Sequence, residues 1–140
     1  MKLVIDTNTI ISGSLWEGPS SRLLKAALRG EVRMFLSLPM LLELREVLQY
    51  PRFSERLAAR GNTAESLMLH FRAACHEAVP AQIKIPEGFR DLDDAHVLAC
   101  AVGAQADVIV TGDKDLLTLK DFNGIPIMGA AEALRLLGIA

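Results

Sequence analysis

The sequence predicts an α/β fold, in which a parallel sheet is covered by helices on both faces. Short apolar runs rich in β-branched residues, such as Val108-Ile109-Val110, indicate buried strands. Segments with the spacing of amphipathic helices alternate with these runs along the chain. The hydrophobic content of 51% suits a sheet that is buried on both faces. Ligands of such sheets bind beyond the carboxyl ends of the strands, so the residues that follow each strand are the ones to examine.

The first half of the chain contains two predicted strands and four predicted helices. Residues 3–5 form an apolar run that Asp6-Thr7-Asn8 ends, because these residue types favour turns and caps. The segment after this turn, which includes Trp16, is interpreted as a loop. The expected elements that follow are a helix over 19–28, a strand over 33–37, a helix over 39–49, a short helix from 53, and a helix over 63–74.

The second half begins with a short strand expected over 77–79 and an irregular connection over 80–89. A long helix and a buried strand come next, and a helical turn, an edge-like strand and a closing helix complete the chain. Their expected ranges are 92–104, 107–111, 115–119, 125–128 and 130–137.

Length and composition exclude several classes of protein. We expect residues 1–140 to form a single domain, since 140 residues match the usual domain size. A net charge of −2 argues against a basic protein that coats nucleic acid, although not against an enzyme that cuts it. No apolar run approaches a membrane span, and no signal peptide is expected. The two cysteines form no C-x-x-C pair and are interpreted as buried, reduced thiols, which fits a cytoplasmic location.

Four acidic residues from remote parts of the chain are expected at or near one edge of the sheet. Asp6 directly follows the first strand, and Asp113 comes two residues after the strand that ends at Thr111. Asp94 begins the apolar stripe of the helix over 92–104, and Glu43 lies one turn into the helix after the second strand. Each acid alone is more often a turn or cap residue than a functional one.

The joint pattern favours a metal site, because carboxylates gathered together repel one another unless cations lie among them. No comparable set of Lys or Arg residues accompanies these acids. Oxygen ligands select hard ions such as Mg²⁺ or Mn²⁺. Such ions activate water and stabilise charge on phosphoryl oxygens, which is the chemistry of phosphodiester hydrolysis.

Four segments in order resemble the PIN domain, and in particular the toxin components of prokaryotic toxin–antitoxin systems. The resemblance covers most of the chain. The segments are Leu3-Val4-Ile5-Asp6-Thr7-Asn8, the helix start that carries Glu43, Asp94-Ala95-His96-Val97-Leu98, and Val110-Thr111-Gly112-Asp113-Lys114-Asp115.

The resemblance implies a three-layer α/β/α sandwich with a central parallel sheet of four to five strands. It implies an Mg²⁺- or Mn²⁺-dependent endoribonuclease that cuts single-stranded RNA, with an antitoxin partner and a homodimeric state. The implied catalytic and metal-binding residues are Asp6, Glu43, Asp94 and Asp113. Asn8 and Thr111 would hold the carboxylates in place, and Lys114 would contact a phosphate or remain an exposed turn residue.

Two assignments have competitors within the sequence. Asp93 replaces Asp94 as the ligand if the helix has another register, but Asp94 aligns with the apolar face. Asp115 competes with Asp113, although it is interpreted as the N-cap of the short helix that follows. His96 is expected to point away from Asp94 and to take no part in catalysis.

Other residues have a functional and a structural interpretation of similar weight. Trp16 either stacks a base or packs on its loop. Several arginines either line a path for RNA phosphates or form solvated helix faces, namely Arg22, Arg45, Arg52, Arg56 and Arg60.

Two other functions compete with ribonuclease activity. The first is a non-catalytic PIN-like module that binds metal, RNA or protein, which the complete set of acids argues against. The second is phosphoaspartyl chemistry on Asp6, which needs a second Asp two residues later in phosphatases, where this chain has Asn8.

Overall fold

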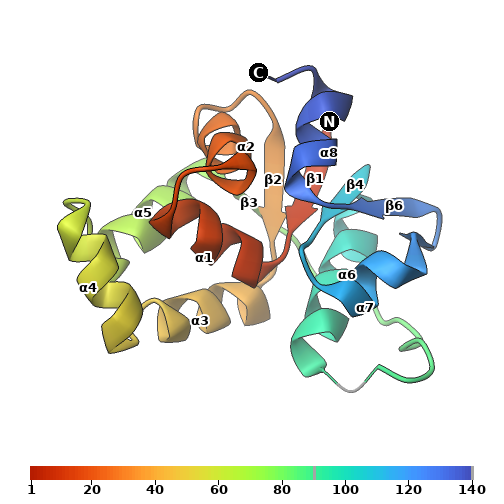
Figure 1. Ribbon diagram of the computed structural model, residues 1–140. Coiled ribbons are helices and arrows are strands. Elements are labelled where there is room, and N and C mark those ends of the chain that lie inside the picture. Colours follow the sequence, from red (N-terminus) through yellow and green to blue (C-terminus); the bar gives the residue numbers. More distant parts are fainter. Residues whose placement is uncertain (90, 140) are drawn as a thin grey trace.

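The computed structural model describes residues 1–89 and 91–139 and confirms the α/β class. Within these residues, one sheet of six strands has the order β3-β2-β1-β4-β6-β5. All neighbouring strands are parallel except β5 and β6, which are antiparallel. Figure 1 shows the sheet at the centre of the molecule. The strands are β1 (Lys2–Ile5), β2 (Arg33–Leu36), β3 (His76–Glu77), β4 (Val108–Val110), β5 (Asp121–Phe122) and β6 (Ile125–Met128).

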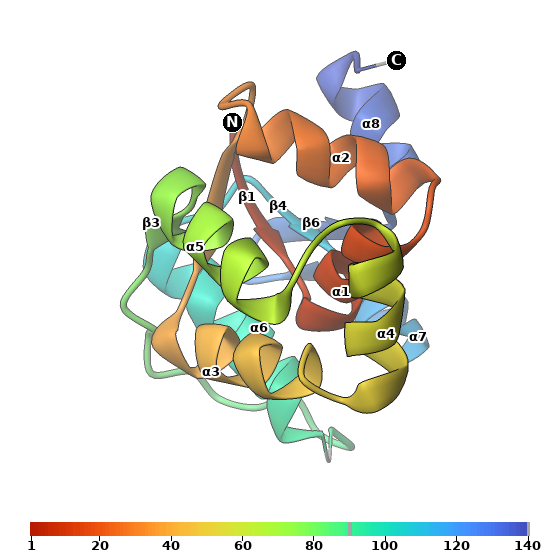
Figure 2. The same ribbon diagram turned by 90° about the vertical axis from the view of Figure 1, so that its left-hand side faces the viewer.

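Helices cover both faces of the sheet, which gives the expected three layers (Figures 1 and 2). On one face α6 packs against β1, β2 and β4, and on the other face α2 and α8 pack against each other. In the described part of the chain the helices are α1 (Thr7–Leu15), α2 (Pro19–Leu28), α3 (Leu38–Val47), α4 (Pro51–Ala59), α5 (Ala64–Ala74), α6 (Leu92–Ala104), α7 (Lys114–Leu119) and α8 (Ala130–Leu137). None of the described helices is long and apolar enough to cross a membrane.

The helix α1 corrects the sequence interpretation, which placed a loop after the first strand. Its β-branched and small polar residues have low helix propensity, so the segment gave no clear helical signal. Capping and packing overcome this propensity. Asp6 accepts a hydrogen bond from the backbone N–H of Thr9 at 2.8 Å, and Ile10, Ile11 and Leu15 are buried.

Close contact with α2 is a further reason why α1 forms. A methyl group on Gly13 would lie 2.7 Å from the carbonyl oxygen of Ser20, so only glycine permits this approach of the two helices. The same packing fixes the direction in which α1 leaves the sheet.

The strand β6 is a second correction, because it lies inside the sheet and not at its edge. The outer strand is β5, whose residues Asp121 and Phe122 pair with Pro126 and Ile125. The two strands are joined by Asn123 and Gly124, both with positive φ (50° and 80°). This is the two-residue turn that Asn-Gly favours, and it adds one strand to the five that the apolar runs indicated.

The parallel register brings the carboxyl ends of β1 and β4 side by side. Ile5 pairs with Val110, and the backbone N–H of Asp6 donates to the carbonyl of Val110 at 2.9 Å. All of the core residues of these two strands are at most 2% exposed. The residues that follow them, Asp6 and Thr111, are therefore held at fixed positions at one edge of the sheet.

Candidate functional site

Asp6 is buried at the carboxyl end of β1, with two groups bound to its carboxylate. The Oδ1 atom accepts the Thr9 backbone N–H at 2.8 Å, and Oδ2 accepts a short hydrogen bond from the Thr111 hydroxyl. Burial raises the pKa of Asp6, while these hydrogen bonds oppose that rise. The carboxylate is therefore fixed in one orientation. Thr111 also accepts the backbone N–H of Asp113 at 3.0 Å, so one hydroxyl links Asp6 to the loop that carries Asp113.

Asp94 lies in the first turn of α6 on the helix face that packs on the sheet. It is only 7% exposed, and Val97, Leu98 and Ala101 on the same face are buried. Asp93 is exposed. This is the register that the apolar stripe predicted.

The N-cap of α7 is Asp113, whereas the sequence suggested Asp115. The Oδ1 atom of Asp113 accepts the N–H groups of Asp115 (2.8 Å) and Leu116 (3.2 Å). The expectation that Asp115 caps this helix is therefore wrong. The helix begins at Lys114, one residue before the expected start, and this leaves the Asp115 side chain free of a capping role.

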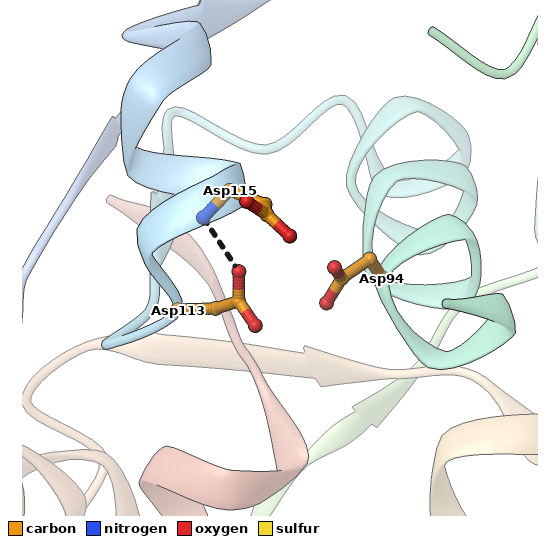
Figure 3. A group of neighbouring side chains, drawn as sticks. All are labelled: Asp94, Asp113 and Asp115. Atoms are coloured by element: carbon orange, nitrogen blue, oxygen red, sulfur yellow. Dashed lines mark hydrogen bonds between the residues drawn. The ribbon is translucent and has the colours of Figure 1, made fainter. Parts of the chain in front are cut away.

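Three carboxylates converge at this point. One carboxylate oxygen from each of Asp94, Asp113 and Asp115 lies within 4.8 Å of the other two. Figure 3 shows the Asp94 side chain facing the two aspartates of α7 across a common gap. Asp94 is buried, Asp113 is half-buried and Asp115 is exposed, so the group opens to solvent on the α7 side.

The electrostatics of this group favour a bound cation. Burial first, and then the charges of Asp113, Asp91, Asp6 and Asp115, raise the pKa of Asp94 to about 6. The ion pairs among the described residues join Lys25 and Arg60 to Glu17 and Arg29 to Glu31, so none of them neutralises these acids.

Glu43 lies apart from the three aspartates and has different neighbours. Its Oε1 accepts a short hydrogen bond from the hydroxyl of Thr7, the first residue of α1, while its buried Oε2 has no partner among the described residues. Burial, together with the nearby Asp93 and Asp91, raises the pKa of Glu43 to about 7. Glu43 therefore borders the site through Thr7, the residue directly after Asp6.

The remaining residues singled out in the sequence lie around this centre. Asn8 is exposed in the first turn of α1, and the hydrogen bonds to the Asp6 carboxylate come from Thr9 and Thr111. Lys114 is exposed between Asp113 and Asp115. His96 lines a pocket of about 430 Å³ with Glu43 and Asp93, on a different side of α6 from the aspartate group.

Sequence reasoning missed Thr7. Its position after Asp6 carries no sign of a partner 36 residues later in the chain. The contact depends on the path of α1, which the sequence interpretation did not include. Once the helix is known, a hydroxyl in its first turn becomes a candidate neighbour for an acid of α3.

The donor set fits a hard divalent cation. The three side chains offer only oxygen atoms, the ligands that Mg²⁺, Mn²⁺ and Ca²⁺ prefer. A cation among them would also remove the repulsion that raises the pKa of Asp94. Asp94, Asp113 and Asp115 are thus the residues that could hold a metal ion.

The family model of the PIN domain matches residues 2–115. The match covers most of the chain and includes every acid of the site, and the chain belongs to the PIN domain family. PIN domains are typically metal-dependent nucleases and generally bind RNA, and the aspartate group described above is compatible with that chemistry. No curated protein gives a significant match to the chain.

Proposed function

We propose that this protein is a metal-dependent endoribonuclease that hydrolyses phosphodiester bonds of single-stranded RNA. The observation that carries the proposal is the convergence of three carboxylates within 4.8 Å at the carboxyl edge of a parallel sheet. A neutral or basic pocket would bind RNA phosphates directly, whereas this one repels them until a cation is present. The arrangement therefore suits cleavage that depends on metal.

Each acid has a proposed role in this reaction. Asp94 and Asp113 hold the metal ion, which we propose to be Mg²⁺ or Mn²⁺, and Asp115 is added to the ligands proposed from sequence. Asp6 is a further ligand, oriented by Thr111. Glu43 completes the set from the α3 side, where its buried Oε2 has no hydrogen-bond partner among the described residues. When bound, the metal supplies Lewis acidity for activating water and stabilising phosphoryl charge.

The test replaces single carboxylates by amides. Asn is as good an N-cap as Asp, so Asp6→Asn and Asp113→Asn remove charge and keep the helix caps. Each of these two variants, and likewise the single variant Asp94→Asn, should lower the rate of Mn²⁺-dependent RNA cleavage at least about 100-fold. Asp121→Asn, an exposed change on β5, is the matched control and should cleave like the parent protein. Cleavage that survives in the three site variants, or that persists in EDTA, would overturn the proposal.

We propose a toxin role in a toxin–antitoxin pair, with cytoplasmic action, one domain over residues 1–140 and a homodimeric state. The support is the resemblance of the four sequence motifs to PIN toxins. Induced expression should arrest growth, Asp94→Asn should not, and co-expression of the product of an adjacent gene should restore growth. Light scattering tests the dimer, and a single cooperative unfolding transition tests the single domain. Growth that continues while the active enzyme accumulates would contradict the toxin role.

A further inference from the structure

One exposed face of α1 leads away from the acids. The residues of α1 that are exposed are Asn8 and Ser12, and Trp16 follows directly after the helix, so the three are spaced i, i+4 and i+8 and share one face. The face begins in the first turn, next to Asp6. At 1.5 Å per residue it runs roughly 12 Å to Trp16.

This face forms one wall of a pocket of about 380 Å³, and α4 supplies the other wall. Its lining residues are Asn8, Ile11, Ser12, Trp16, Arg52 and Phe53. Figures 1 and 2 show α1 and α4 as neighbouring helices on the same side of the sheet. The pocket volume is within the range of small-ligand sites, and its aromatic residues are Phe53 of α4 and Trp16, which directly follows α1.

Trp16 is an accessible aromatic ring of this pocket, and a cation accompanies the second ring, Phe53. Trp16 is 46% exposed, which leaves much of the indole uncovered. The Arg52 guanidinium lies 4.6 Å from the centre of the Phe53 ring, and Arg52 is absent from the ion pairs among the described residues. Outside the pocket lining, the Tyr50 ring is nearly parallel to that of Phe53, with centres 6.4 Å apart. The two lining rings and the Arg52 charge are what stacked bases and phosphates require.

Two other arginines hold the pocket in place. Arg56 and Arg60 donate hydrogen bonds to the carbonyl of Leu15, at 3.0 and 3.3 Å, at the end of α1. Arg56 also lies 6.0 Å from the Trp16 ring, and Arg60 pairs with Glu17 at 3.0 Å. They tie α4 to the residue before Trp16, so Arg52 remains the arginine of α4 available to a ligand.

We propose that this pocket is a nucleotide-binding subsite, which holds an unpaired base next to the phosphodiester that is cut. The inference rests on the proposed ribonuclease function and extends it to positioning residues. The base stacks on Trp16 or Phe53, and Arg52 pairs with a neighbouring phosphate. A paired base is stacked between its neighbours in a duplex and cannot enter, so the subsite selects single strands.

The test uses the fluorescence of Trp16, the single tryptophan of the chain. Cleavage-deficient Asp94→Asn protein is titrated with a single-stranded oligoribonucleotide in Mg²⁺, and with the same sequence in a duplex. Saturable quenching by the single strand is expected, with at least about tenfold weaker binding of the duplex. Equal binding of both forms, or binding that leaves Trp16 fluorescence unchanged, overturns the inference.

Variants separate a subsite from a packing role. With labelled RNA, Trp16→Ala should weaken single-strand binding about 5- to 150-fold, the range measured for lost base stacking. Arg52→Gln should weaken it about 2- to 5-fold, as expected for the loss of one exposed ion pair. In the active protein they should raise KM while leaving kcat within a few-fold. Arg135→Gln, an exposed change on α8 at the far end of the molecule, is the control and should bind RNA normally.

The outcomes distinguish this inference from the proposed function. Quenching by RNA in a protein that cleaves nothing with any divalent metal supports the subsite and refutes the ribonuclease. Normal cleavage by Trp16→Ala and Arg52→Gln with unchanged KM supports the ribonuclease and overturns the subsite.

Discussion

Asp94→Asn should stabilise the protein at neutral pH when no metal is present. The parent carboxylate is buried beside like charges, which raises its pKa from 3.8 to about 6. Because the pKa of this acid is raised in the folded state, the contribution of Asp94 to the free energy of unfolding is fully present below pH 3.8 and is lost as the pH rises through about 6. At about 1.36 kcal/mol for each pH unit, the loss above pH 6 amounts to about 3 kcal/mol. An uncharged amide of the same shape avoids that loss.

The assay is denaturant unfolding in EDTA at pH 7.5 and pH 5. Since some of the gain is offset by solvent screening and by the amide's own hydrogen-bonding needs, Asp94→Asn should unfold with a free energy about 1–3 kcal/mol higher at pH 7.5. The difference should shrink at pH 5, where the parent carboxyl binds a proton. Asp121→Asn, whose side chain is exposed on β5, should match the parent protein at both pH values.

Divalent metal should reverse the order of the two proteins. A ligand that binds only the folded state adds about 4.1 kcal/mol at a concentration about 1,000 times its Kd. The parent protein should gain this in Mg²⁺ or Mn²⁺, and Asp94→Asn should gain much less. If Asp94→Asn is less stable than the parent protein in EDTA at pH 7.5, the reasoning about gathered charge is refuted.

Three further changes test other parts of the site. Thr111→Val leaves the buried Asp6 carboxylate and the Asp113 N–H without their hydrogen-bond partner. The free energy of unfolding in denaturant should therefore fall by about 1–3 kcal/mol, and calorimetry should show metal binding weakened about 10- to 100-fold. An unchanged metal affinity would contradict this role of Thr111. Without metal, the parent protein should lose stability as the pH rises from 4.5 through about 7, because the pKa of Glu43 is raised to about 7 in the folded state. Glu43→Gln should abolish this loss, and thermal melts in EDTA across the same pH range measure it. A pH profile unchanged by the substitution would contradict this prediction. Gly13→Ala places a methyl group against Ser20 and should cost about 1–3 kcal/mol by denaturant unfolding, whereas Ser12→Ala on the exposed face should cost little.

The strands β1, β2, β4 and β6, as well as the register of α6, could be predicted because their signals are local. The apolar stripe that starts at Asp94 distinguishes it from Asp93, and the structure buries the first and exposes the second. Asp6 could be placed at the sheet edge because β1 is a continuous apolar run that ends there. The same local reasoning gave the helices over 92–104 and 130–137 with their observed bounds.

Features that depend on tertiary contacts could not be predicted in this way. The helix α1 forms against its propensity because Gly13 lets it pack on α2, and helix propensity carries no information about that packing. The contact of Thr7 with Glu43 depends on that helix. The approach of Asp115 to Asp94 depends on the cap of α7 lying at Asp113, two residues before the expected cap, which leaves the Asp115 side chain facing the site.

The gathered acids are also tolerable because three helices begin beside them. Asp6 and Asp113 accept backbone N–H groups at the starts of α1 and α7, and Asp94 lies in the first turn of α6. The N-terminus of a helix carries a partial positive charge, which stabilises nearby carboxylates without any Lys or Arg. A basic side chain would occupy the place of a cation, whereas backbone N–H groups stabilise the carboxylates without placing a positive side chain among them. This explains how the fold holds negative charge at one edge of the sheet and still presents it to a metal ion.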